Sequence, residues 1–237
     1  MQIEQQEIVI VTPEGEMPAF LCIPREDYPK PAVIVFMEAF GLTPHIKDVT
    51  RRIAQEGYLA IAPDLYHRNL PDNKFGYDEV ESARSMMYSL DFKQTVEEDI
   101  KATLDYLKLR SDVDSDRIGV MGFCFGGSMA FYTATRFSAE IAVAAPFYGV
   151  VLDEWLEAVQ NVTVPVYLFF GGADPFIPKE RIAQIELRFQ QLGKNYRLKV
   201  YDDADHGFFC SERSSYNKLA AEESWYELTE FFQKHMS

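Results

Sequence analysis

The stretch GVMGFCFGGSMAF, residues 119–131, places a cysteine between glycines in the pattern G-x-C-x-G. Gly122 and Gly126 allow a sharp turn that would lead a strand into a helix and present the thiol of Cys124 at the amino end of that helix. The helix dipole favours the thiolate there, and the thiolate is the nucleophilic form of cysteine. The pattern therefore predicts a nucleophile. The alternative is a small, buried thiol inside a glycine-rich bend.

An acid and a histidine follow further along the chain, each after an apolar run. Asp174 comes after residues 164–170, and His206 comes after residues 196–201. The order of nucleophile, acid and histidine is the one expected for the triad of α/β-hydrolases. His206 would take the thiol proton and later protonate the leaving group, while Asp174 would orient the imidazole and stabilise its cation. As alternatives, Asp174 is a turn residue before Pro175, and His206 is a surface histidine.

A nucleophile of this kind also needs two hydrogen-bond donors for the oxyanion that forms during attack. The backbone N–H of Phe125, the residue after the predicted nucleophile, is the first candidate. The second should lie in the turn after an earlier strand, and Ala39 in the segment MEAFG occupies that position.

The elements that must position these residues alternate along the chain. Strands are expected at residues 7–12, 17–23, 31–37, 58–62, 117–121, 141–145, 164–170 and 196–201, the first two forming a hairpin. Helices are expected at residues 46–55, 96–109, 127–137, 179–192 and 216–235. This alternation predicts a mostly parallel sheet with helices on both faces, in a single domain over residues 1–237 without a separate cap domain. Residues 66–94 interrupt the alternation and are expected to form a loop and a short helix over the sheet edge.

Composition limits the partners and the location. The 237 residues are 47% hydrophobic and carry a net charge of −14, which argues against a nucleic-acid or anionic-membrane surface. The amino-terminal residues do not resemble a secretory signal, and the most apolar run, residues 141–152, is too short to span a bilayer. Three widely spaced cysteines form neither a disulfide framework nor a zinc pattern. We therefore expect a cytoplasmic protein, and a monomer.

These motifs together resemble those of the dienelactone hydrolases, which are cysteine members of the α/β-hydrolase superfamily. The resemblance runs in order from about residue 31 to 221 and so covers most of the chain. Its motifs are EAFG at 38–41, PHIKD at 44–48, APDLY at 62–66, GFCFGG at 122–127, GAD at 172–174 with IP at 177–178, and HGF at 206–208.

The resemblance implies hydrolysis of an enol-lactone such as carboxymethylenebutenolide through a thioester on the cysteine. It also implies that Glu38 contacts the resting nucleophile and takes part in its activation. Dienelactone-specific members hold the substrate carboxylate with an arginine four residues after the histidine, but this chain has Cys210 there. Arg213, in the later Arg-x-x-Tyr pattern, and Arg84 are the remaining candidates for contacts to a substrate carboxylate.

Other interpretations remain open. A cluster of Asp202, Asp203 and Asp205 beside the histidine suggests a metal site, although adjacent loop residues are more typical of a solvated turn. Glu38 is alternatively a structural partner of a cation. The proposed chemistry needs neither a metal nor an organic cofactor, only a small-molecule ester or lactone. A general carboxylesterase or thioesterase would share the triad, and a non-catalytic binding protein would share only the fold.

Overall fold

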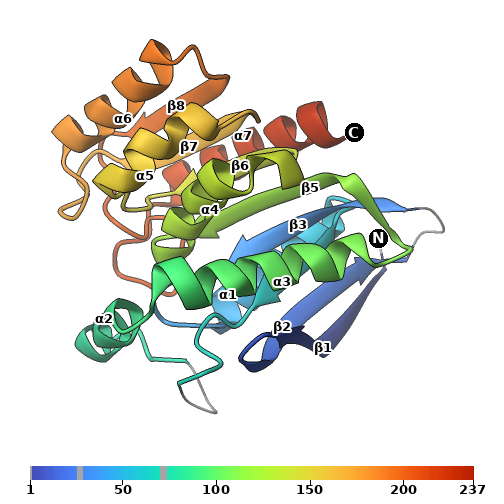
Figure 1. Cartoon of the computed structure of the whole chain (residues 1–237). Helices are drawn as coiled ribbons and strands as arrows, with labels where there is room; N and C mark the ends of the chain where they lie inside the picture. The colour runs from blue at the N-terminus through green and yellow to red at the C-terminus, as the bar shows by residue number, and fades with distance from the viewer. Residues whose placement is uncertain (1, 26–28, 70–73) are drawn as a thin grey trace. The chain divides into compact units, whose positions relative to one another are not determined.

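The computed structural model describes residues 2–25, 29–69 and 74–237. The chain divides into two compact units, Met1–Ile118 and Gly119–Ser237. Each unit is described separately below, and Figure 1 labels the elements of both. The prediction of one domain over residues 1–237 stays a prediction.

The first unit is built on a hairpin and the two strands that follow it. The hairpin is formed by β1 (Ile3–Thr12) and β2 (Gly15–Pro24), which are antiparallel and in register from Ile3 opposite Pro24 to Thr12 opposite Gly15. β2 is also antiparallel to β4 (Leu59–Pro63), and β4 is parallel to β3 (Lys30–Phe36). The predicted hairpin and the two strands after it are therefore confirmed.

The first helix of the first unit begins where the sequence supplies a cap. α1 (Pro44–Gln55) begins after Thr43, whose hydroxyl accepts a hydrogen bond from Ile46 N–H, and has proline in its first turn. It contacts strands β1 to β4, and α3 (Glu97–Lys108) contacts β1. The short helix expected between residues 66 and 94 is α2 (Val80–Tyr88), and a π-helical turn (Phe92–Val96) leads into α3. Residues 70–73 of that segment lie outside the described residues.

The segment after this gap lies against the turn that follows β3. Lys74 forms a β-bridge with Gly41, and Phe75 N–H donates to the Phe40 carbonyl at 2.9 Å. The ring of Tyr77 lies edge-on against Phe40, with centroids 4.8 Å apart. This segment therefore lies at the end of β3 within the first unit, and its predicted location over the sheet edge stays a prediction.

The second unit contains parallel strands. β5 (Val113–Phe123) begins in the first unit and pairs in the second with β6 (Val143–Phe147), followed in order by β7 (Val166–Gly171) and β8 (Tyr196–Tyr201). β6 and β7 are buried at every residue, as expected for parallel strands covered on both faces. The helices of this unit are α4 (Phe125–Arg136), α5 (Asp153–Glu157), α6 (Lys179–Gln191) and α7 (Lys218–Met236), with short 3₁₀ turns at Ser138–Glu140 and Ala158–Asn161.

The core of the second unit is rich in aromatic rings that pack between the strands. Phe147 of β6 stacks on Phe169 of β7 with ring centroids 4.3 Å apart, and Tyr167 stacks on Phe169 at 4.2 Å. Phe123, at the end of β5, packs against Phe147 at 4.9 Å. This aromatic layer supports the ends of the strands from which the predicted site residues project.

Within the described part of the chain, we find no helix of the length and apolarity needed to cross a membrane.

Candidate functional site

The turn at Cys124 joins β5 directly to α4 with a strained backbone. Cys124 has φ 54° and ψ −113°, a left-handed conformation that is rarely adopted by residues other than glycine. Its N–H donates to the Phe147 carbonyl at 3.1 Å, and its carbonyl accepts from Ser128 N–H at 3.0 Å. Strain of this kind persists where the surrounding structure holds it, and it is common at functional sites. The thiol is partly exposed at the amino end of α4.

Glycine is required just beyond the turn because α4 approaches β6 closely. A Cβ atom added to Gly127 would lie 2.2 Å from the Phe147 carbonyl oxygen, and one added to Gly149 would lie 2.4 Å from the backbone of Gly127. Both positions face backbone atoms, which cannot move away easily. Gly127 therefore lets α4 pack closely against the end of β6.

Asp174 contacts both its own turn and His206. One carboxylate oxygen, Oδ1, accepts hydrogen bonds from Phe176 N–H at 2.7 Å and Ile177 N–H at 3.2 Å, so the residue does hold a turn. The other, Oδ2, lies 2.7 Å from Nδ1 of His206. Because both oxygens are engaged, the carboxylate has a defined orientation toward the histidine.

The loops after β7 and β8 lie close together, which brings these two residues into contact. Ala173 N–H donates to the Ala204 carbonyl at 3.0 Å, and Gly172 N–H donates to the Tyr201 carbonyl at 2.8 Å. A Cβ atom at Gly171 would lie 2.4 Å from the Ala204 carbonyl oxygen. Glycines at the end of β7 therefore permit the approach that places Asp174 beside His206.

His206 is buried, with 6% of its surface exposed, and its side chain also hydrogen-bonds to Cys124. Burial by itself would lower the pKa of the imidazole. The charge of the Cys124 sulfur and the hydrogen bonds to Asp174 and Cys124 act in the opposite direction and raise the pKa of His206 to about 10. The interpretation of His206 as a surface histidine is therefore wrong. At neutral pH the raised pKa therefore favours the imidazolium form of His206.

Two aromatic rings contact the imidazole of His206. Tyr148 is fully buried with φ 37°, and its ring centroid lies 5.2 Å from that of His206. Phe176 lies on another loop at 5.0 Å with an interplanar angle of 82°, and 54% of its surface is exposed. The sequence indicates Tyr148 only as one of several aromatic residues of the core or of a pocket. It gives no prediction for Phe176. The place of Phe176 two residues after the predicted acid was the available signal.

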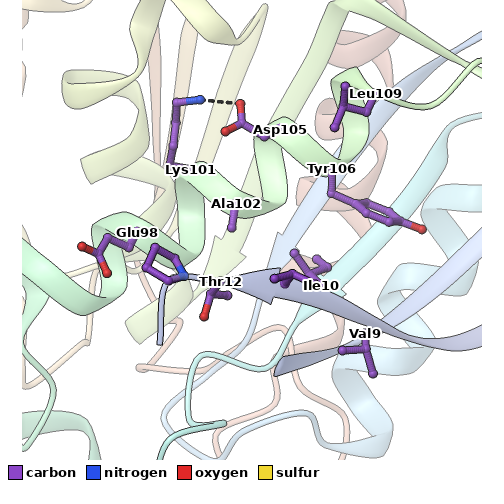
Figure 2. Close-up of a pocket in the computed structure, with 11 residues that line it drawn as sticks. Val9, Ile10, Thr12, Glu98, Lys101, Ala102, Asp105, Tyr106 and Leu109 are labelled. Atoms are coloured by element: carbon purple, nitrogen blue, oxygen red, sulfur yellow. Dashed lines mark hydrogen bonds and ion pairs between the residues drawn. The ribbon is translucent and has the colours of Figure 1, made fainter. Parts of the chain in front are cut away.

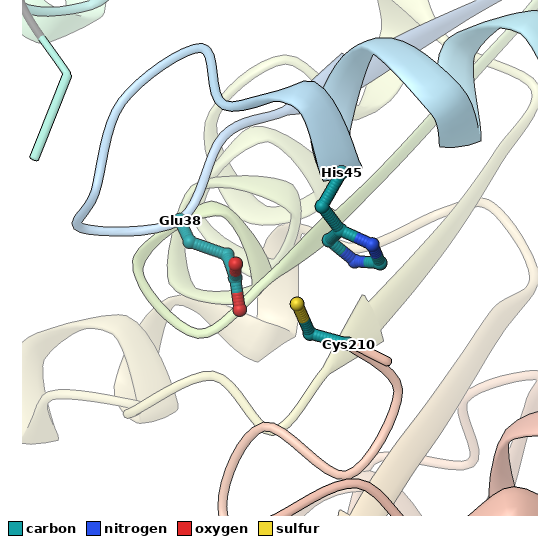
Figure 3. Close-up of side chains that lie close together, drawn as sticks. All are labelled: Glu38, His45 and Cys210. Atoms are coloured by element: carbon teal, nitrogen blue, oxygen red, sulfur yellow. The ribbon is translucent and has the colours of Figure 1, made fainter. Parts of the chain in front are cut away.

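Glu38 lies in the first unit, immediately after β3, and is fully buried. A carboxylate oxygen of Glu38 and a ring nitrogen of His45, on the first turn of α1, lie within 4.8 Å of each other (Figure 3). The sequence does not predict the proximity of His45 to this carboxylate.

The two predicted oxyanion donors lie in different units. Phe125 is the first residue of α4, so its N–H belongs to the helix amino terminus, where the dipole is positive. Ala39 is buried in the turn after β3, where its carbonyl accepts a hydrogen bond from the Tyr66 hydroxyl at 2.9 Å.

The two candidate arginines differ in their surroundings. Arg84 is exposed on α2 and lies 3.5 Å from Glu81 on the same helix. The guanidinium of Arg213 lies against Gly207, where an added Cβ would be 2.1 Å from Nη1. Arg213 is therefore close in space to the residue that follows His206, whereas Arg84 faces solvent.

The exposure of the three aspartates beside His206 argues against the metal site that the sequence suggested. Asp202, Asp203 and Asp205 are all exposed, and Asp205 Oδ1 accepts from His206 N–H at 2.6 Å, as expected for a solvated turn.

The other two cysteines are buried. Cys22 is a core residue of β2, and burial raises the pKa of its thiol to about 12. Cys210 is also buried.

A groove of about 610 Å³ in the first unit lies between β1 and α3 (Figure 2). Val9 and Ile10 contribute from the strand, and Tyr106 and Leu109 contribute from the helix. None of the predicted catalytic residues lines this groove.

A second carboxylate–histidine pair in the first unit was not predicted. Asp99 of α3 is fully buried, and its Oδ1 lies 3.1 Å from Nε2 of His67, which follows β4. Arg68 contacts both oxygens of the same carboxylate, with Nη1–Oδ2 at 2.5 Å and Nη2–Oδ1 at 2.8 Å.

Comparison with known proteins shows the family. The sequence profile described as "Dienelactone hydrolase family" matches residues 17–236. A "Putative carboxymethylenebutenolidase" from Synechocystis sp. is 34% identical over 216 residues, which are 87% of this chain and 87% of that protein. A protein of the same description from Saccharolobus solfataricus is 32% identical, over 97% of this chain and 98% of its own length.

Solved structures agree with this result. The crystal structure of a "Putative Dienelactone Hydrolase" from Klebsiella pneumoniae superposes with a TM-score of 0.91 at 27% identity, covering 99% of this chain and 100% of that one. The predicted α/β-hydrolase fold and the resemblance on which it was based are confirmed.

Proposed function

Because the chain belongs to the dienelactone hydrolase family, we propose that it cleaves an activated ester or lactone through a thioester on Cys124. The hydrolase class follows from the family. The contact chain from Asp174 through His206 to Cys124, contained in one unit, is the observation that supports the mechanism.

Acylation begins with attack by the Cys124 thiolate on the carbonyl carbon. The raised pKa of His206 supports an imidazolium beside the sulfur, and an imidazolium in this position would stabilise the attacking thiolate. The S–C bond forms, the C–O bond to the leaving group breaks, and His206 gives its proton to the departing oxygen. Asp174 holds the imidazole through Nδ1, which leaves Nε2 for this transfer.

Deacylation reverses the role of the histidine. Neutral His206 takes a proton from water, the new oxygen attacks the thioester carbonyl, and the C–S bond breaks to return the thiolate. The proton gained from water restores the imidazolium. Each cycle therefore consumes one water and needs no external oxidant, reductant or metal.

We assign the oxyanion donors to the backbone N–H groups of Phe125 and Ala39. The place of Phe125 at the amino end of α4 supports its assignment, since the helix dipole stabilises a negative oxygen there. The assignment of Ala39, and that of Glu38 as a contact of the resting nucleophile, depend on the family resemblance. Glu38 is fully buried at the end of an apolar strand, which fits a specific role because a buried carboxylate is costly without interactions.

The proposed substrates are lactones and esters with good leaving groups, such as enolates and phenolates. A thiolate is a weak match for amides and simple alkyl esters, because a poor leaving group is expelled less readily than the thiolate itself. An enol-lactone such as carboxymethylenebutenolide fits this chemistry. The proximity of Arg213 to Gly207 makes it the better of the two candidate contacts for a substrate carboxylate.

A broader carboxylesterase or thioesterase is the second candidate, favoured by the buried Cys210 at the position of the family's carboxylate-binding arginine. A panel of anionic dienelactones and neutral aryl esters, assayed with the wild type and Cys124→Ala, tests both. Preference for the anionic lactone supports the dienelactone assignment, and equal activity supports the broader one. Hydrolysis of either class by Cys124→Ala at the wild-type rate would refute the mechanism.

A further inference from the structure

Phe176 is a large apolar side chain that remains exposed directly beside the proposed catalytic histidine. Its ring centroid lies 5.0 Å from that of His206, and 54% of its surface is exposed. We propose that Phe176 forms the apolar wall of the subsite for the leaving group, and that it selects esters and lactones whose leaving group is flat and unsaturated. The inference rests on the proposed function.

The position of Phe176 is set by the residue that orients the histidine. Phe176 N–H donates to Oδ1 of Asp174 at 2.7 Å, while Oδ2 of the same carboxylate contacts His206 Nδ1 at 2.7 Å. The ring is therefore attached to a backbone that the carboxylate itself fixes. A side chain anchored in this way can present a defined surface to a substrate despite its exposure.

The other neighbours of the imidazole are closed to a substrate. Tyr148 contacts the imidazole at 5.2 Å but is fully buried, and Asp174 occupies Nδ1 with a buried carboxylate. Of the two rings that contact His206 among the described residues, only Phe176 is exposed.

The chemistry of acylation places the leaving group beside this ring. As the S–C bond forms and the C–O bond breaks, the leaving oxygen takes the proton of His206 and must lie within hydrogen-bond distance of Nε2. The atoms attached to that oxygen then lie along the accessible side of the imidazole, where Phe176 is exposed. Aromatic rings prefer offset-stacked or edge-on contacts with other flat groups, and these contacts stabilise beyond the area that they bury.

Deacylation provides an internal reference because the leaving group has already departed. Two esters with the same acyl group share the same thioester and the same deacylation rate. Phenyl acetate and trifluoroethyl acetate form such a pair, one with a flat aromatic leaving group and the other with a small activated one. For such a pair, kcat/KM reports the acylation step, in which Phe176 is proposed to contact the leaving group. The shared deacylation step does not involve Phe176.

The test measures kcat/KM for both acetates with the wild type, Phe176→Ala and Phe176→Tyr. We expect Phe176→Ala to lower kcat/KM about 10-fold for phenyl acetate and less than about 2-fold for trifluoroethyl acetate. Phe176→Tyr keeps the ring and should stay within about 2-fold of the wild type on both. Leu187→Ala, at an exposed apolar residue on α6, is the matched control and should change neither value.

Equal losses on both acetates, or no loss on either, would overturn the inference. Equal losses would mean that Phe176 acts on His206 itself, and a shifted upper limb of the pH–rate profile in Phe176→Ala would reveal this. Failure of the proposed function has a different signature, namely acetate hydrolysis by Cys124→Ala at the wild-type rate.

Discussion

The two units each contain a buried pair of aspartate and histidine, and the pairs differ in what else contacts them. In the second unit, Asp174 Oδ2 lies 2.7 Å from His206 Nδ1, and the opposite side of the ring faces Cys124. In the first unit, Asp99 Oδ1 lies 3.1 Å from His67 Nε2, and Arg68 bridges both carboxylate oxygens.

The difference lies in which cation balances the carboxylate. The guanidinium of Arg68 is permanently charged and binds Asp99 in a bidentate geometry, which makes the cluster a rigid connection between α3 and the segment after β4. At Asp174 the remaining oxygen accepts only backbone N–H groups, so the cation is the imidazolium of His206. We therefore expect loss of the first pair to affect stability and loss of the second to affect chemistry.

Replacing His206 and His67 in turn tests this contrast, and we expect the largest difference in kcat between these two variants. His206→Asn removes the proton donor and acceptor, so kcat on an aryl ester should fall by about 10³-fold or more. His67→Asn should leave kcat within about 3-fold of the wild type. Steady-state kinetics on both variants, with circular dichroism to verify folding, makes the comparison. Comparable losses of kcat in the two folded variants would remove the distinction.

Replacing the two aspartates extends the contrast to the acids. Asp174→Asn cannot stabilise the imidazolium and favours the wrong tautomer, so kcat should fall by about 10²- to 10⁴-fold with the fold retained. The amide can still accept from Phe176 N–H, which preserves the turn. If kcat of Asp174→Asn remained near the wild-type value, the residue would hold only the turn.

Asp99→Ala should act on stability instead. It leaves the guanidinium of Arg68, whose side chain is largely buried, with only its ion pair to the more exposed Glu14. Removing one partner of a buried ion pair typically costs about 3–5 kcal/mol, and the remaining pair with Glu14 makes this range an upper bound. Urea unfolding should show a clear loss within this bound, while kcat measured well below the unfolding transition stays within about 3-fold of the wild type. An unchanged unfolding midpoint would contradict the structural role.

The sequence was informative where function imposes a local pattern. The proposed chemistry would constrain the G-x-C-x-G turn and the places of the acid and the histidine after successive strands. Residues 174 and 206 meet because the parallel strands before them are neighbours. Asp99 and His67 have no such pattern, since Asp99 lies inside a helix and no motif or spacing rule connects it with His67. Phe176 was missed because Asp-Pro-Phe-Ile-Pro is typical of a turn, and exposure of its ring is a property of the folded loop.

The smallest expected effect is a change in pH dependence, which follows from the pKa of His206. It distinguishes the contribution of Cys124 to this pKa from that of Asp174. Since burial lowers this pKa, its rise from 6.5 to about 10 depends on the charge of Cys124 and on the hydrogen bonds to Asp174 and Cys124. The stability contributed by the raised pKa is complete below pH 6.5 and is lost as pH rises through about 10. Activity should fall over the same upper limit, as the imidazolium loses the proton that the leaving group needs.

Cys124→Ala removes the charge on the sulfur, so the pKa of His206 should decrease in that variant. A titration of the imidazole proton and carbon signals by NMR measures it in both proteins. The same pKa in the wild type and Cys124→Ala would mean that no thiolate lies beside the ring.

The most direct test of the cysteine mechanism is to trap the acyl enzyme. Wild-type protein is mixed with excess phenyl acetate, quenched in acid within the first turnovers, digested and examined by mass spectrometry. We predict an acetyl group on the peptide that contains Cys124, its accumulation in Asp174→Asn if deacylation is slowed, and its absence in Cys124→Ala. Sustained hydrolysis without acetyl on Cys124, or with acetyl only on Cys22 or Cys210, would contradict the mechanism.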